Sequence, residues 1–161
     1  MREELAGHLP ALRRFAHGLA GNRADAEDLL QDCLAQAVAR EKSWRGGNLR
    51  AWLLAIMVNR FRNGLRAARR RPALTPLDDV EIAAADALPD PLANRRLHAA
   101  LDSLAPESRA VVMLVVLEEM SYAETAQVLG IPIGTVMSRL SRARRQMAEM
   151  LARDNIVSLR R

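Results

Sequence analysis

The chain has 161 residues, of which 50% are hydrophobic and 27% charged, and its formal net charge is +5 at pH 7. This composition is typical of a globular protein with one or two small domains, and no apolar run approaches the roughly 20 residues that span a bilayer. Charged residues follow Met1 where a signal peptide has its apolar core, and a single cysteine excludes an internal disulfide. We therefore expect a cytoplasmic protein without membrane insertion.

The charges are unevenly distributed along the chain. Residues 1–70 carry 13 basic and 7 acidic side chains, residues 71–92 carry one basic and five acidic side chains, and residues 93–161 carry 10 basic and 7 acidic side chains. Basic segments favour a polyanion such as nucleic acid, because binding releases its counterions. The acidic segment between them is repelled by nucleic acid and favours a basic surface elsewhere.

Helical periodicity dominates the first 70 residues, and strand signals are almost absent, which predicts an all-α fold. A first helix is expected from Leu5 to Ala20 and a second from Asp25 to Ala37. One face of the second helix is apolar and includes Cys33. The opposite face, which we call the polar strip, consists of Asp28, Gln31, Asp32 and Ala35. It is either a solvated helix face or a docking surface for another protein.

A loop at residues 41–48 places Trp44 beside two glycines, which permit unusual backbone angles. A third helix is expected at residues 49–70, buried on nearly all sides over residues 51–58. Further along, it gathers polar and basic side chains on one side, namely Asn59, Arg62, Asn63 and Arg66. An aromatic loop beside a basic helix is typical of sites that hold an unstacked base of single-stranded nucleic acid. The alternative is that Trp44 only covers the domain core.

Residues 72–92 combine four prolines with five acidic side chains, a composition that disfavours regular structure. We therefore expect two small helical domains, at residues 1–71 and 93–161, joined by a flexible acidic linker at residues 72–92. The linker is either an ordinary tether or a segment with a basic partner.

Residues 121–146 predict a helix-turn-helix. Ser121 and Glu124 have the spacing of a capping box, so a helix begins near Ser121. Gly130 is suited to end this helix, and Pro132 is suited to open the next one.

The second of these helices has two faces at about 100° per residue. Its apolar face is expected to pack and consists of Val136, Leu140, Ala143 and Met147. Its polar face is free for DNA and consists of Ser138, Ser141, Arg142 and Arg145. Arg139 and Arg144 lie at the flanks, where they suit phosphates or structural pairs. The alternative is an amphipathic surface helix whose arginines are only solvated.

Together, these segments resemble a bacterial RNA polymerase sigma factor of the extracytoplasmic-function (ECF) type, which keeps only the region 2 and region 4 domains. The resemblance is carried by four motifs, at residues 25–32, 49–59, 121–124 and 134–144. The run at residues 134–139 is most similar to the general-stress subgroup of alphaproteobacteria. Asn63 departs from the family, in which many members carry aspartate at this position.

The resemblance implies three sets of contacts. Core polymerase, through the coiled coil of its β′ subunit, would contact Asp25, Asp28, Gln31, Asp32 and Ala35. The minus-ten element would contact Trp44, Asn59, Arg62, Asn63 and Arg66. The minus-thirty-five element would contact Thr135, Met137, Ser138, Arg139, Ser141, Arg142 and Arg145. The family further implies that the β flap of polymerase and an anti-sigma factor are partners, and that the linker enters the RNA exit path.

We expect no enzymatic activity, no metal, no cofactor and no small-molecule substrate. The three histidines, His8, His17 and His98, lack ligand spacing, and no nucleophile–base pair or glycine-rich phosphate loop is visible. Two other functions compete with that of a sigma factor. One is a dimeric helix-turn-helix repressor or activator, and the other is a sigma mimic that titrates an anti-sigma protein without binding promoters.

Overall fold

The computed structural model describes residues 2–70 and 91–159, and this part of the chain contains helices and no strand, which confirms the all-α prediction. It divides into two compact units, one on each side of residues 71–90. The first unit contains α1 (Arg2–Ala20), α2 (Arg23–Ala39), the short 3-10 helix η1 (Glu41–Ser43) and α3 (Leu49–Arg69). The second contains α4 (Pro91–Asp102), α5 (Pro106–Val112), the π-helical turn η2 (Met113–Leu117), α6 (Tyr122–Leu129) and α7 (Ile133–Leu159).

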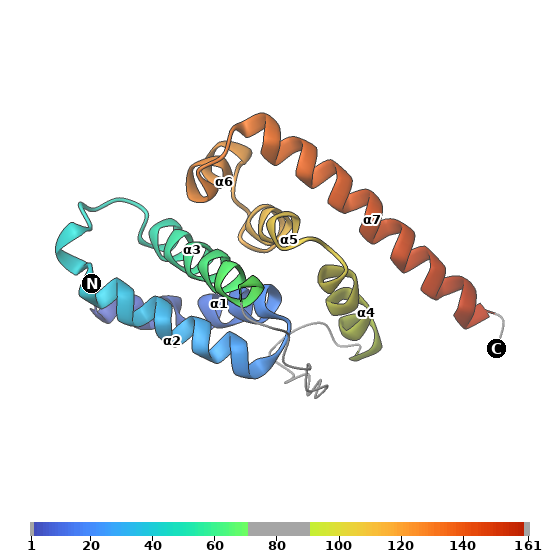
Figure 1. The fold of residues 1–161 in the computed structure, drawn as a ribbon, viewed down its shortest axis with the longest axis horizontal. Helices are drawn as coiled ribbons and strands as arrows, with labels where there is room; N and C mark the ends of the chain where they lie inside the picture. Colours follow the sequence, from blue (N-terminus) through green and yellow to red (C-terminus); the bar gives the residue numbers. More distant parts are fainter. Residues whose placement is uncertain (1, 71–90, 160–161) are drawn as a thin grey trace. The chain divides into compact units, whose positions relative to one another are not determined.

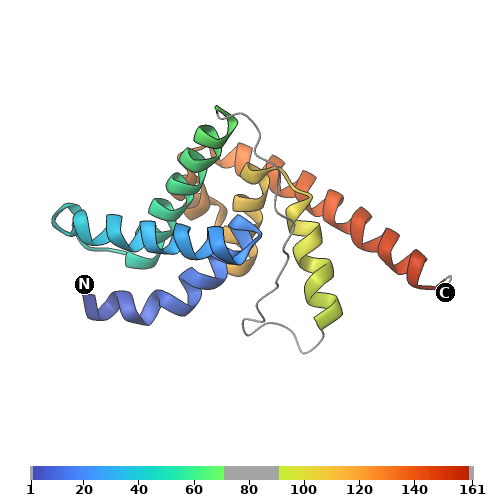
Figure 2. The ribbon, with the colours of Figure 1, turned by 60° about the horizontal axis from the view of Figure 1, so that its bottom comes forward.

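In the first unit, α1, α2 and α3 pack on one another (Figures 1 and 2). Their apolar faces meet in a core whose largest fully buried side chains are Leu12, Phe15, Leu19, Leu53, Leu54, Met57 and Val58. Helix α1 ends where Gly21 takes a φ of 80°, as its position after the helical pattern predicts. The expected helix boundaries agree with the observed ones to within three residues.

Asparagine caps begin α2 and α3. Asn22 accepts a hydrogen bond from the Asp25 backbone N–H at 2.9 Å, and Asn48 accepts one from the Ala51 N–H at 3.1 Å. Each bond satisfies an amide that the first turn of a helix leaves without a partner. The sequence interpretation did not identify these caps, although asparagine directly before an apolar periodic segment is a usable signal.

Cys33 is fully buried between α2 and α3, as expected for a core position, and its thiol donates to the Leu53 carbonyl at 3.4 Å. Burial raises the pKa of the Cys33 thiol from 9.0 to about 12, because the thiolate would lose its hydration. We expect thiol reagents at pH 8 to label Cys33 only after denaturant is added. The pKa of Cys33 is higher in the folded state than in the unfolded state. Its contribution to the free energy of unfolding is therefore complete below pH 9 and is lost as the pH rises toward 12. Rapid labelling of the native chain would contradict this assignment.

In the second unit, α7 packs against α4, α5 and α6 (Figures 1 and 2). Its core includes Val111, Leu114, Val136 and Leu140. Arg109 of α5 joins α5 to the end of α4, since its Nε donates to the Leu101 carbonyl at 2.9 Å and its Nη2 to the Asp102 carbonyl at 3.1 Å. These carbonyls belong to the last turn of α4, where the helix supplies no further i+4 N–H groups, and the Leu101 carbonyl also accepts from the Leu104 N–H at 3.1 Å. Burial lowers the pKa of Arg109, and the nearby Asp102 opposes that shift.

The linker expected at residues 72–92 lies mostly outside the described residues, so its character stays a prediction. Its last two residues, Pro91 and Leu92, instead open α4. None of the helices in the described residues is long and apolar enough to cross a membrane.

Candidate nucleic-acid interface

The helix-turn-helix is formed by α6, a short turn and the start of α7. The capping box at Ser121 is confirmed, because the Ser121 N–H donates to Oε2 of Glu124 at 2.8 Å and the Glu124 N–H donates to Oγ of Ser121 at 3.1 Å. These hydrogen bonds lower the pKa of the Glu124 carboxyl. They fix where α6 begins, and therefore the direction in which it leads into the turn.

The turn itself depends on Gly130, which has a φ of 62° and ends α6 in the left-handed conformation. The Ile131 N–H donates back to the Ala126 carbonyl at 3.1 Å, which closes the last turn of α6. Pro132 accepts from the N–H groups of Thr135 and Val136, so it lies directly before α7 and not inside its first turn. The turn is therefore present as expected. Pro132 is the residue directly before α7 and not its first residue.

Helix α7 has the two faces that the sequence predicts. Val136, Leu140 and Ala143 are buried, whereas Ser138, Ser141, Arg142 and Arg145 are exposed. Met147, the fourth residue of the predicted apolar face, is only half-buried. The exposed residues offer hydroxyl and guanidinium donors on one side of a helix narrow enough to enter a major groove. The oxygen of Ser138 lies close to the helix, since its Oγ donates to the Thr135 carbonyl at 3.2 Å. We call the surface formed by Ser138, Ser141, Arg142 and Arg145 the arginine face.

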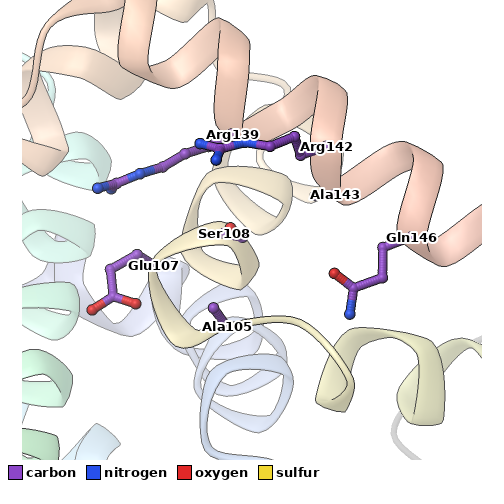
Figure 3. Close-up of a pocket in the computed structure, with 7 residues that line it drawn as sticks. All are labelled: Ala105, Glu107, Ser108, Arg139, Arg142, Ala143 and Gln146. Atoms are coloured by element: carbon purple, nitrogen blue, oxygen red, sulfur yellow. The ribbon is translucent and has the colours of Figure 1, made fainter.

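Arg139 differs from these residues in its surroundings. It is half-buried beside α5, and its Nη1 atom is buried without a hydrogen-bond partner among the described residues. It lines an open hollow of about 370 Å³ between α5 and α7, together with Glu107, Ser108 and Arg142 (Figure 3). At one end of the hollow, Gln146 donates from Nε2 to the Ser103 carbonyl at 2.8 Å and links α7 to the residue after α4. A buried guanidinium atom without a partner is costly.

The start of α7 also carries an exposed apolar pair, of which the resemblance implies a DNA contact for Met137 but not for Ile133. Ile133 is 49% exposed and Met137, one turn later, is 52% exposed. Gly134 lies between them, and a Cβ at this position would meet no atom within 4 Å. Thr135 is half-buried. The spacing of Ile133 and Met137 by four residues was the available signal that the two share a helix face.

In the first unit, the Trp44 loop has the backbone that its glycines predict. Gly46 and Gly47 have φ values of 88° and 99°, and Trp44 ends η1 with a half-buried side chain. Asn59, Asn63 and Arg66 are exposed on α3, and Arg62 is half-buried. Asn59 lies ten residues into α3, about 15 Å along the helix axis from its first residue at a rise of 1.5 Å per residue. The polar side of α3 therefore begins well beyond the end of α3 that follows the Trp44 loop.

The polar strip on α2 is exposed, and its two carboxylates and the nearby Asp25 differ in what they contact. Asp25 takes part in the cap of α2, since Asn22 donates from Nδ2 to Asp25 Oδ2 at 2.7 Å. Asp32 pairs with Arg60 of α3. Asp28 has no hydrogen bond or ion pair with any residue that the structure describes. Asp28 is therefore the carboxylate of the strip that is available to a cationic partner.

Comparisons with known proteins match both units to one family. Sigma-70 region 2 matches residues 5–71, and Sigma-70 region 4 matches residues 94–147. Among curated relatives, the ECF RNA polymerase sigma factor EcfG of Rhodopseudomonas palustris is 35% identical over 161 residues, covering 96% of this chain and 86% of the relative. The ECF RNA polymerase sigma factor SigE of Mycolicibacterium smegmatis is 36% identical over 154 residues, and the match spans 92% of this chain and 60% of the relative.

Solved structures give the same result. The chain is similar to the sigma factor RpoE in its co-crystal structure with the anti-sigma factor NepR from Bartonella quintana, with a TM-score of 0.75 and 32% identity over 94% of this chain and 96% of that one. It is also similar to CnrH in complex with the cytosolic domain of CnrY, with a TM-score of 0.69 and 28% identity over 94% and 87% of the two chains. The chain has a region 2 unit followed by a region 4 unit, and its relatives align with nearly its whole length. It is therefore a member of the ECF sigma factor family.

Proposed function

We propose that the chain is a dissociable initiation factor that binds core RNA polymerase and directs it to promoters in the cytoplasm. The observation that carries this proposal is the occurrence, in order, of a region 2 unit with an exposed acidic helix face and a region 4 unit with an exposed arginine face. The chain contributes no chemistry of its own in this scheme, and polymerase performs catalysis.

The arginine face is proposed to enter the major groove of the minus-thirty-five element. Arg142 and Arg145 are exposed and positively charged, and arginine binds either phosphate or the O6 and N7 acceptors of guanine. Ser138 and Ser141 are small enough to let α7 approach the bases closely. Arg139, half-buried beside α5, is better placed for a phosphate at the edge of the groove than for a base.

The first unit is proposed to make the other contacts. Trp44, on a loop shaped by two glycines, would stack on a base unpaired from the minus-ten element, and Asn59, further along α3, would contact the same element. Arg62, which is half-buried, and the exposed Asn63 and Arg66 would follow the DNA backbone. Asp28 and its neighbours on the polar strip would dock on the coiled coil of the β′ subunit. The ion pair between Asp32 and Arg60 is exposed, so Asp32 could exchange Arg60 for a cation of the partner at little cost.

Regulation by an anti-sigma factor is proposed from the relatives. RpoE, which is 32% identical to this chain, is bound to the anti-sigma factor NepR in its structure. Together with the similarity to EcfG, this favours a NepR-like inhibitor and membership of the general-stress subgroup. In the same scheme, the β flap of polymerase contacts the second unit, and the acidic linker at residues 72–92 lies in the RNA exit path.

The proposal is tested by reconstituted transcription with purified core polymerase and a library of promoter fragments. A sigma factor yields holoenzyme and initiation at a defined class of promoters. A dimeric repressor binds DNA without polymerase, and a sigma mimic binds the anti-sigma factor without supporting initiation. A correctly folded chain that forms no holoenzyme and starts no transcript overturns the proposal.

Replacing Gly134 with alanine is expected to change stability and promoter binding in opposite directions. A Cβ here meets no atom of the chain, so the second unit should gain about 0.5 to 1 kcal/mol from the lower entropy of its unfolded state. If α7 lies deep in the groove, the added methyl group should weaken promoter binding severalfold. Gly7→Ala in α1 is the matched control, since its Cβ also meets open space. Urea denaturation and promoter binding by holoenzyme measure both effects, and unchanged binding would place Gly134 away from the DNA.

A further inference from the structure

Ile133 and Met137 are two large apolar side chains that the second unit leaves in solvent at the start of α7. They are 49% and 52% exposed and lie one helical turn apart. At about 100° per residue, the row formed by Ile133, Met137 and Ser141 runs directly beside the row formed by Gly134, Ser138 and Arg142. The apolar pair is therefore continuous with the arginine face.

The surroundings of this pair favour DNA as its occupant. Gly134 has no side chain beside the pair, and Ser138 and Ser141 are small and exposed. Arg142 and Arg145 follow on the same exposed side and carry the charge that a phosphate backbone requires. The first turn of α7 carries no acidic residue that would repel that backbone.

The major groove displays one apolar group, the 5-methyl of thymine. A methionine side chain is long, flexible and without a hydrogen-bond donor, so it cannot donate to the N7 or O6 acceptors of a purine edge, and its sulfur is only a weak acceptor. We infer that Met137, supported by Ile133, packs against the 5-methyl group of one thymine in the minus-thirty-five element, so that this chain prefers an A·T pair at that position. The inference rests on the proposed function and adds which base the start of α7 reads.

The contact is tested by removing only the methyl group from the DNA. Each thymine in the minus-thirty-five element of the strongest promoter from the transcription library is replaced in turn by deoxyuridine, which keeps every hydrogen-bonding group. Binding by holoenzyme is then measured for the wild-type chain and for Met137→Ala. The substitution is safe for folding, because Met137 is exposed and alanine is the better helix former.

One deoxyuridine position is expected to lower wild-type affinity about fourfold, the factor that corresponds to burying one methyl group. Met137→Ala should bind the thymine and deoxyuridine duplexes equally, since the methyl group then has no partner. Val116→Ala is the matched control: Val116 is 58% exposed in η2, and its loss should leave the ratio of the two affinities unchanged.

The inference is overturned if the minus-thirty-five element contains no thymine, or if the wild-type chain is insensitive to deoxyuridine at every position. It is also overturned if Met137→Ala keeps the wild-type ratio of the affinities for the thymine and deoxyuridine duplexes. If Met137→Ala impairs holoenzyme assembly while the ratio is unchanged, the pair docks on protein and the inference is wrong. In these cases, initiation by the wild-type holoenzyme still supports the proposed function. If no holoenzyme forms at all, the proposed function and the inference fail together.

Discussion

Replacing Asp28 with arginine is expected to lower the affinity of the chain for core RNA polymerase by about 2 kcal/mol or more, roughly thirtyfold. Asp28 lies on the exposed polar strip of α2 and has no partner among the described residues. An arginine in its place turns the attraction to a cationic docking surface into repulsion. The loss should shrink as salt is added, because exposed charges are screened beyond about 10 Å at 0.1 M ionic strength. Titration of core polymerase with labelled chain measures the effect.

Glu3→Arg is the control for the charge change, because Glu3 is an exposed acid in the first turn of α1. Asp32→Ala is a separate comparison, since its carboxylate already pairs with Arg60 and its removal also leaves that arginine without this partner. We expect Glu3→Arg to bind almost normally and Asp32→Ala to have a smaller effect than Asp28→Arg. Equal affinities for wild type and Asp28→Arg would show that the polar strip is only solvated.

Replacing Phe15 with alanine is expected to unfold the first unit without unfolding the second. Phe15 is fully buried among α1, α2 and α3, and truncating a buried phenylalanine costs about 3 to 5 kcal/mol. That is comparable with the total stability of a unit of this size, about 4 to 10 kcal/mol. The second unit has its own core, so it should keep its helices.

The chain supplies its own optical probe for this experiment. Both tryptophans, Trp44 and Trp52, belong to the first unit, so fluorescence follows that unit, while circular dichroism follows the helices of both. Phe15→Ala should abolish or shift the fluorescence transition in urea and leave a helical transition visible by circular dichroism. Leu140→Ala, which truncates a buried side chain of α7, should do the reverse. A shift of the fluorescence transition by Leu140→Ala would mean that the units unfold together.

Much of the fold could be predicted because the deciding interactions are local in the chain. The capping box of Ser121 and Glu124 joins residues three apart, and the end of α6 depends on the ability of Gly130 alone to take a positive φ. The division of α7 into a buried and an exposed face follows from a period of 3.6 residues. Such features do not depend on which residues of other helices pack against them. The two asparagine caps were equally local and were available to the same reasoning.

The family was also determined by the sequence, since four motifs in the correct order resemble region 2 and region 4. The roles of individual residues stay predictions, however, because they depend on DNA and polymerase. Asn59 and Arg66 are exposed as a binding role requires, but exposure is also what a solvated helix face predicts. The substitutions proposed above separate these two interpretations.

The sequence by itself determined the helices, their caps and turn, the buried faces and the family, because these follow from residues close together in the chain. Only the tertiary structure decided which charged groups are already occupied. It pairs Asp32 with Arg60, 28 residues away, while Asp28 has no such partner among the described residues. It also places Arg139 half-buried beside α5 and leaves Met137 in solvent. Helix periodicity gives the side of a helix on which a residue lies, whereas its neighbours depend on how the helices pack.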